Sequence, residues 1–347
     1  GWTKIQTALR GQIRRFDRIG RDAPPWLGDV LGLVDDAMSG SDYDVRQLTG
    51  EDTVTLETQA GIEHRPRSRP YLKWVGSKQR EAPRLLPFAR AALGADGTFY
   101  EPFCGSAAMT LALAPERAFL CDAEPGLVNA HLVVRDAPSD VAAALRDLGG
   151  PCPADLYRDR RRRLNDLLPA VSGKSVEAAA LFIFINKAGF NGLWRVNSKG
   201  ECNVPPGSKV GTDAAISLPT EPELVSVSQV LKRAQIVRCP WSDLAIAPGA
   251  GDVVFVDPPY LGTFTGYSNT AMPSLVSLHE RTSAWAGNGA KTMFTYDDSA
   301  PEIRDAIDDL FVRQGWRRLS IDRHSAVSSD RSTRSTMRQV LITNIGE

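Results

Sequence analysis

The stretch Val253-Val254-Phe255-Val256-Asp257-Pro258-Pro259-Tyr260 is an apolar run that ends at an acidic residue and two prolines. Four consecutive apolar residues after Gly251-Asp252 predict a buried strand at the centre of a parallel sheet. In open α/β sheets, ligands bind just beyond the carboxyl ends of such strands. Because proline fixes φ and biases the preceding residue away from helix, we expect an extended, rigid loop. Asp257 is therefore a candidate to meet a ligand there.

The chemistry of this loop suits an amino group on an aromatic ring. The Asp257 carboxylate and the Pro258 carbonyl are two hydrogen-bond acceptors, and the Tyr260 ring offers a face for stacking. Pro259 keeps the segment between them extended. Taken alone, the loop favours a simple turn at the end of a strand over a ligand site. A second motif is needed to distinguish a ligand-binding loop from a simple turn.

The segment Phe99-Tyr100-Glu101-Pro102-Phe103-Cys104-Gly105-Ser106-Ala107-Ala108-Met109 predicts a strand, a turn of small residues and the start of a helix. Small residues let a ligand approach the backbone closely. The next expected strand, Ala118-Phe119-Leu120-Cys121, ends at Asp122, where an acid in a nucleotide-binding βαβ unit bonds ribose hydroxyls. The turn lacks a G-x-G-x-x-G pattern, which argues against a dinucleotide. We expect a ligand without phosphates.

Together with two further stretches, these motifs resemble the Dam-like DNA adenine-N6 methyltransferases of the alpha group, D12 class, which use S-adenosylmethionine. The four stretches are Pro70-Tyr71-Leu72-Lys73-Trp74-Val75-Gly76-Ser77-Lys78, Glu101 to Ala107, Phe184 to Gly207, and the Asp-Pro-Pro-Tyr loop. Their order is cofactor motifs, recognition segment and catalytic loop, as in the alpha group. The resemblance spans residues 70 to 345.

The resemblance, with the alternation of strands and helices, implies an α/β fold with a doubly wound, mostly parallel sheet of the Rossmann-like methyltransferase type. Residues 70–150 and 230–347 are expected to form the catalytic domain. Residues 151–229 are expected to form an inserted target-recognition domain, helical first and ending in a β-hairpin that reads DNA. Residues 1–69 are expected to be an N-terminal helical extension and a linker.

The implied function is transfer of a methyl group from S-adenosylmethionine to N6 of an adenine flipped out of a short duplex site, GATC or another site containing 5'-GA. Two alternatives stay open. One is an amino-methyltransferase acting on another target, such as cytosine N4 or RNA adenine. The other is a non-catalytic DNA-binding module with a decayed cofactor site, because Pro240-Trp241 stands where the family usually has an Asp-Phe pair beside the cofactor adenine. Asp243 could replace the missing acid from a shifted loop.

The resemblance carries over site residues one by one. The expected catalytic residues are Asp257, Pro258, Pro259 and Tyr260. The expected cofactor-binding residues are Tyr71, Trp74, Gly76, Lys78, Glu101, Phe103, Gly105, Ser106, Asp122, Trp241 and Asp257. Among these, the resemblance places Trp74 and Lys78 at the methionine end of the cofactor and Asp122 at its ribose. The expected DNA-binding residues are Asn191, Leu193, Arg195, Asn197 and Pro205.

Leu193 and Arg195 flank Trp194, so on an extended strand they are expected to point to the same side. The resemblance makes Leu193 a wedge beside the flipped adenine and Arg195 a contact to a guanine edge. The alternative is that Leu193 packs the hairpin and Arg195 contacts a phosphate. The choice decides whether this strand reads sequence or only binds DNA.

Composition agrees with a globular protein: 347 residues, 42% hydrophobic, with a formal net charge of zero. No run approaches the roughly 20 apolar residues that span a bilayer, so we expect a cytoplasmic, nucleoid-associated protein. The cysteines and histidines lack metal-ligand spacing, so no metal is expected.

Basic residues gather locally despite the zero net charge. They lie in residues 312–340, in Arg160-Arg161-Arg162-Arg163 and on the expected helices of residues 1–40. The first two groups are read either as contacts to the DNA backbone or as exposed faces. The N-terminal helices are read as a DNA contact, a packing cap or a homodimer element.

Overall fold

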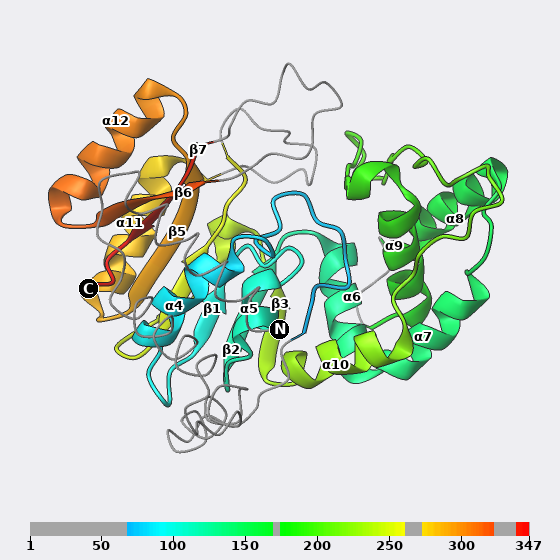
Figure 1. Ribbon diagram of the computed structural model, residues 1–347, viewed down its shortest axis with the longest axis horizontal. Helices are drawn as coiled ribbons and strands as arrows, with labels where there is room; N and C mark the ends of the chain where they lie inside the picture. The colour runs from blue at the N-terminus through cyan, green and yellow to red at the C-terminus, as the bar shows by residue number, and fades with distance from the viewer. Residues whose placement is uncertain (1–67, 169–173, 261–272, 323–337, 347) are drawn as a thin grey trace, which may run out of the picture. The chain divides into compact units, whose positions relative to one another are not determined.

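The computed structural model describes residues 68–168, 174–260, 273–322 and 338–346, and within them seven strands form one sheet (Figure 1). The order is β3-β2-β1-β4-β5-β7-β6; β7 runs antiparallel to both neighbours and the other pairs are parallel. The strands are β1 (Phe99–Glu101), β2 (Ala118–Asp122), β3 (Ala234–Arg238), β4 (Val253–Val256), β5 (Lys291–Asp297), β6 (Arg317–Asp322) and β7 (Arg338–Thr343). The connection order reverses between β1 and β4, which is the switch point where such sheets bind ligands.

Strand β4 lies between β1 and β5, at the centre that the apolar run predicts. All four of its residues are buried, with Val253 and Phe255 in one core cluster and Val254 and Val256 in another. Helices α4 (Ala82–Ala92) and α5 (Ala108–Leu113) contribute to the first cluster, and α11 (Leu275–Gly287) and α12 (Pro301–Leu310) to the second. Helices on both faces confirm the doubly wound α/β sheet.

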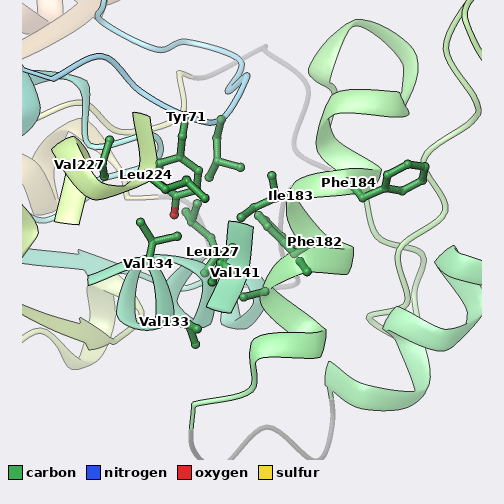
Figure 2. Close-up of a cluster of buried hydrophobic side chains, with 14 of the residues drawn as sticks. Tyr71, Leu127, Val133, Val134, Val141, Phe182, Ile183, Phe184, Leu224 and Val227 are labelled. Atoms are coloured by element: carbon green, nitrogen blue, oxygen red, sulfur yellow. The ribbon is translucent and has the colours of Figure 1, made fainter. Parts of the chain in front are cut away.

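A third cluster joins the sheet to a group of helices beside it (Figure 1). These helices are α6 (Pro125–Asp136), α7 (Pro138–Asp147), α8 (Ala154–Leu167), α9 (Val176–Ala188) and α10 (Glu221–Leu231). Ten of the 13 residues of α9 are buried, on every face of the helix, which is typical of a helix enclosed by others. Figure 2 shows Phe182 and Ile183 of α9 turned toward Leu127 of α6 and Leu224 of α10.

The inserted region begins with helices α8 and α9. Helix α10 extends past residue 229 and packs on α6 and α7. The domain boundaries drawn from the sequence therefore stay a prediction. Short 3-10 turns complete the described elements: η3 (Phe190–Gly192), η4 (Trp241–Asp243) and η5 (Val312–Gln314).

Every described residue belongs to one compact unit, Pro66–Glu347. The expected N-terminal helices, the linker and the homodimer contact lie outside the described residues. So do Arg323, Arg331 and Arg334 of the basic segment. No helix in the described ranges is long and apolar enough to cross a membrane.

Gly97 provides a test of packing in the loop that precedes β1. A Cβ on Gly97 would lie 1.9 Å from the Gly251 carbonyl oxygen, just before β4. That oxygen already accepts a bond from Gly94 N at 2.8 Å, so the backbone cannot yield freely. We expect Gly97→Ala to lower the free energy of unfolding by about 1–3 kcal/mol in urea denaturation.

Gly287→Ala is the control, because nothing lies within 4 Å of a Cβ at the end of α11. Its free energy of unfolding should change by no more than about 0.5 kcal/mol. Equal losses in the two variants would contradict the packing argument.

Candidate active site

Three neighbouring parallel strands each bring one acidic side chain to the same edge of the sheet. Glu101 is the last residue of β1, Asp122 is the last residue of β2, and Asp257 follows β4 directly. The strands β2, β1 and β4 lie side by side in that order. Their carboxyl ends therefore place the three acids in a row at the switch point, as expected for a ligand site in this class of sheet.

Asp257 is fixed from three directions. Lys78 Nζ forms an ion pair with Oδ2, the Tyr260 hydroxyl donates to Oδ1 at 3.0 Å, and Thr295 Oγ1 donates to Oδ1 at 2.7 Å. The Asp257 side chain is 16% exposed, whereas Lys78 is 3% exposed. A carboxylate offers about four lone-pair sites, so three donors leave room for one more. The arrangement is a preoriented acceptor facing the end of the sheet.

Lys78 also donates to the Gly76 carbonyl at 3.0 Å, and Gly76 has a φ of +82° that favours glycine. The resemblance placed Lys78 at the methionine end of a cofactor. In the structure its ammonium group instead lies on the catalytic-loop carboxylate, which it neutralises and orients. A direct cofactor contact by Lys78 stays a prediction.

Tyr260 is largely buried rather than presented as an open stacking face. Its ring is 8% exposed and packs 5.2 Å from the Tyr296 ring, and its hydroxyl accepts a bond from Gln339. The hydroxyl orients Asp257, and stacking of the ring on a base stays a prediction. The Pro258 side chain is buried and that of Pro259 partly buried beside it, so the two prolines pack the loop against the protein.

The segment 70–78, called the strap here, lies against residues 101–107, called the cofactor loop. Ser77 Oγ and Ser106 Oγ are 2.8 Å apart, and a Cβ on Gly105 would lie 2.7 Å from Trp74 Cδ1. Gly105 has a φ of +46°, so both space and backbone conformation exclude a side chain there. The loop therefore presents bare backbone at the end of β1.

A buried hydrogen-bond chain runs from the strap to the cofactor loop through His131. His131 Nε2 lies 2.7 Å from the Gly105 carbonyl, and Nδ1 lies 2.9 Å from the Tyr71 hydroxyl. A carbonyl can only accept, so Nε2 carries the proton and Nδ1 accepts from Tyr71. Burial lowers the pKa of His131 to about 4, which keeps the ring neutral near pH 7. No sequence pattern predicts this role, because a lone histidine belongs to no motif.

Asp122 braces the same loop. Its Oδ2 accepts from Gly105 N at 3.0 Å and its Oδ1 from Glu124 N at 3.1 Å. Burial raises the pKa of Asp122, and these backbone hydrogen bonds oppose the rise. The acid lies where a ribose-binding residue is expected, and the ribose contact itself stays a prediction.

An aromatic pair joins the turn that follows β3 to the cofactor loop. Phe103 and Trp241 stack with ring centroids 5.2 Å apart and an angle of 24°. Helix α11 holds the indole: its nitrogen donates to Ser277 Oγ at 2.9 Å, and the Arg281 guanidinium lies 4.8 Å from the ring centroid. These contacts hold the turn at Pro240-Trp241, which stands where the family usually has an Asp-Phe pair, against α11. Asp243 is exposed within this turn.

The expected hairpin begins later than the resemblance suggested, because residues 184–188 form the last turns of α9. Beyond η3, Val196 and Cys202 form an antiparallel bridge, and Asn203 N donates to the Arg195 carbonyl at 3.0 Å. Trp194 is fully buried, whereas Leu193 and Arg195 are partly exposed on either side of it. This alternation agrees with the predicted shared side for Leu193 and Arg195.

Arg195 makes two bonds across the hairpin, from Nε to Asn203 Oδ1 at 2.7 Å and from Nη2 to Asn203 O at 3.0 Å. Asn197 shapes the turn, because its Oδ1 accepts from Lys199 N and Glu201 N at 2.9 and 3.0 Å. These bonds show structural roles for two residues expected to contact DNA. Their DNA contacts stay predictions.

The other two expected DNA contacts lie at the base of the hairpin. Asn191 is exposed and has a φ of +51°. Pro205 is partly buried, and its carbonyl accepts from Phe190 N at 3.0 Å. Both positions help to set the course of the chain around η3.

The arginines of α8 have partners within the protein. Arg161 donates to the Val204 carbonyl at 2.7 Å, which holds the second arm of the hairpin, and Arg160 lies over the Phe184 ring at 4.4 Å. On the same helix, Arg162 pairs with Asp159 at 3.0 Å and Arg163 with Glu177 at 2.7 Å. In the C-terminal basic segment, Arg313 pairs with Asp309 at 2.7 Å and Arg318 with Asp308 at 3.1 Å. Surface pairs of this kind exchange readily, and the expected phosphate contacts stay predictions. Among the residues placed by the structure, no group of three or more His, Cys, Asp or Glu side chains could hold a metal ion.

The strand order, with β7 antiparallel beside β5, and the acids at the ends of β1, β2 and β4 define a Rossmann-like methyltransferase fold. A family model described as D12 class N6 adenine-specific DNA methyltransferase matches residues 74–321. The match covers most of the chain, so the protein belongs to this family of adenine-specific DNA methyltransferases.

Individual relatives agree with the family. A type II methyltransferase of Lactococcus lactis subsp. cremoris is 27% identical over 290 residues, covering 80% of this chain and 96% of the relative. A DNA adenine methylase of Vibrio cholerae serotype O1 is 28% identical over 239 residues, covering 67% and 74%. A DNA adenine methylase of Haemophilus influenzae is 30% identical over 211 residues, covering 58% and 68%.

Glu101 generates a prediction about stability and pH. Burial raises the pKa of Glu101 to about 8 from an ordinary value of 4.5, and bonds from Thr110 oppose this rise. Between these values the folded protein holds a proton that the unfolded chain has released, so stability is lost as pH rises through this window. Glu101→Gln cannot ionise, and its amide oxygen can still accept from Thr110.

We therefore expect the free energy of unfolding of Glu101→Gln to fall less between about pH 5 and pH 8 than that of the wild type. Urea denaturation at several pH values measures both curves, with exposed Glu280→Gln as the control. Parallel curves for wild type and Glu101→Gln would rule out the buried acid as the cause.

Proposed function

We propose that the protein transfers a methyl group from S-adenosylmethionine to N6 of an adenine flipped out of a short duplex site that contains 5'-GA, with GATC as the expected site. The observation that carries the proposal is the Asp257 carboxylate, held by Lys78, Tyr260 and Thr295 at the end of β4 and still partly exposed. A carboxylate held in this way needs little reorganisation when charge develops beside it.

The chemistry of N6 explains why such an acceptor is needed. The lone pair of an exocyclic amine is delocalised into the ring, so the nitrogen is a poor nucleophile. Asp257 and the Pro258 carbonyl would accept the two N6 hydrogens and favour a pyramidal nitrogen. As positive charge grows on nitrogen, the fixed carboxylate stabilises it mainly in the transition state. Flipping is required because the amine is otherwise paired inside the duplex.

The residues present fit S-adenosylmethionine, which supplies an electrophilic methyl group on a positively charged sulfur. Asp122, at the end of β2, would hold the ribose hydroxyls. Phe103 and Trp241 supply an apolar wall for an adenine ring. The cofactor loop supports close backbone approach, because Gly105 has no room for a side chain. This fit supports an enzyme rather than a binding module.

DNA reading would fall to the hairpin. Leu193 and Arg195 lie on the side of the strand opposite buried Trp194, where they can reach a partner. An apolar wedge can fill an unstacked step, and arginine can bond guanine O6 and N7 in the major groove. Activity on chromosomal DNA would place the protein at the nucleoid. The type II relative supports a role in restriction-modification.

Asp257→Ala tests the chemistry. We expect it to lower single-turnover methylation of a GATC duplex by at least about 100-fold, because the acceptor for the amine is lost. Asp257→Asn keeps the side chain's size and should show a loss of the same order. Cofactor affinity, measured by calorimetric titration, should change much less than the rate. Retention of more than about a tenth of the wild-type rate would exclude the catalytic role.

Asp122→Ala is the counterpart in the cofactor site. It should raise the dissociation constant for S-adenosylmethionine, since it removes the acid from the end of β2. An unchanged titration would refute the ribose assignment.

Arg195→Ala tests sequence reading. Loss of a base-edge contact should relax the preference for the first guanine by about 1–3 kcal/mol, measured as relative methylation of GATC and of duplexes altered at that base. Asn203→Ala is the matched control, because it removes the cross-hairpin partner and leaves Arg195 in place. Equal losses on all duplexes, or the same relaxation in both variants, would overturn the guanine contact.

A further inference from the structure

The backbone of Lys73, in the middle of the strap, is held by a single side chain of α9. Lys73 N donates to Asn186 Oδ1 at 2.8 Å, and Asn186 Nδ2 donates to the Lys73 carbonyl at 2.6 Å. The two bonds require opposite ends of one carboxamide, which fixes its orientation. Asn186 is fully buried and lies 113 residues from Lys73 in sequence. We call this pair of bonds the Asn186 clasp.

A glycine of the recognition segment closes on the same residue. A Cβ on Gly192 would lie 2.4 Å from Lys73 Cβ and 3.2 Å from its carbonyl oxygen. Gly192 has a φ of +69° and directly precedes Leu193. Lys73 is therefore held between the end of α9 and the turn that leads into the hairpin. A shift of that turn would be transmitted to the strap backbone.

On its other side the strap holds the cofactor loop. Trp74, the next residue, lies against the bare Cα of Gly105, and Tyr71 reaches the Gly105 carbonyl through His131. Two contacts thus separate Leu193 from the cofactor loop: Gly192 on Lys73, and Trp74 on Gly105. The strap belongs to both sites at once.

Contacts between aromatic rings form a second connection from the strap through α9 to the hairpin. The Trp74 ring lies 6.3 Å from Phe182 of α9, and Phe182 lies 4.3 Å from the buried Trp194 of the hairpin. Close-packed interiors transmit displacement rather than absorb it. The strap, α9 and the start of the hairpin are therefore expected to move as one body.

We propose that Asn186 is a positioning residue that couples recognition of the DNA site at the hairpin to binding of the cofactor at residues 101–107. This inference rests on the proposed function and adds the route between its two sites. Coupling is reciprocal: a duplex with the correct site tightens cofactor binding, and bound cofactor sharpens discrimination between sites. Asn186 touches neither ligand in this scheme and acts through Lys73.

The test measures the coupling factor, which is the dissociation constant for S-adenosylhomocysteine without DNA divided by that with a saturating GATC duplex. Titration calorimetry on the full chain gives both values. We expect a wild-type factor of at least about 5. Asn186→Ala should lower it by at least about 2-fold, toward 1. At saturating cofactor, the same variant should also discriminate less between GATC and a duplex changed at one base.

Asn129→Ala is the matched control. Asn129 makes the same kind of clasp on the backbone of Ser175, at 2.9 and 3.0 Å, without touching the strap. Its coupling factor should equal that of the wild type. Gly192→Ala is a second probe, which keeps the Asn186 side chain and displaces Lys73 from the recognition side. It should lower the factor as well, and it keeps the test decisive if Asn186→Ala does not fold.

The outcomes separate the two ideas. Three outcomes would overturn the coupling role and leave the proposed function standing. The first is a wild-type coupling factor near 1. The second is an unchanged factor in a folded Asn186→Ala or Gly192→Ala variant, and the third is an equal loss in Asn129→Ala. A wild type that binds neither S-adenosylhomocysteine nor the duplex overturns the proposed function and the coupling with it.

Discussion

The ion pair between Lys78 and Asp257 is the contact on which the site depends. It joins the first motif of the described chain to the last across 179 residues, and it places a cation that is 3% exposed against the acid at the end of β4. Removing one partner of a buried pair leaves the other charge uncompensated, at a cost of about 3–5 kcal/mol. The strap can therefore leave the sheet only at a large cost, and the strap in turn holds the cofactor loop.

Much of the fold could be predicted from local pattern. The apolar run at 253–256 is the central strand because both faces of a parallel sheet are buried, and acids at the ends of two earlier strands follow from the same logic. The family resemblance added the hairpin and the cofactor segments. These features are local in sequence, so a single chain displays them.

The parts that escaped prediction are those that exist only after folding. Thr295 lies within β5 and Gln339 near the start of β7, and their hydrogen bonds to Asp257 and Tyr260 form only when these strands pair beside β4. A hydroxyl within a buried strand was the available signal. His131 had no signal, since its partners come from two distant segments. The contact of the Tyr260 ring with Tyr296 likewise appears only when β4 and β5 lie side by side.

An asparagine side chain that holds the backbone of another residue constrains the two positions differently during sequence evolution. Within the part of the chain that the structure describes, this contact occurs three times: Asn186 on Lys73, Asn129 on Ser175, and Asn165 on Cys202 at 2.8 and 3.0 Å. In each case one side chain pairs with the N–H and carbonyl of a single residue, as a neighbouring strand would. Such a contact involves only the backbone of the residue it holds and does not depend on that residue's side chain. The clasp therefore places no demand on the identity of residues 73, 175 and 202, although the Ser175 side chain also caps α9 and Cys202 is buried in the core. The clasp alone should produce no covariation between the two ends of these contacts.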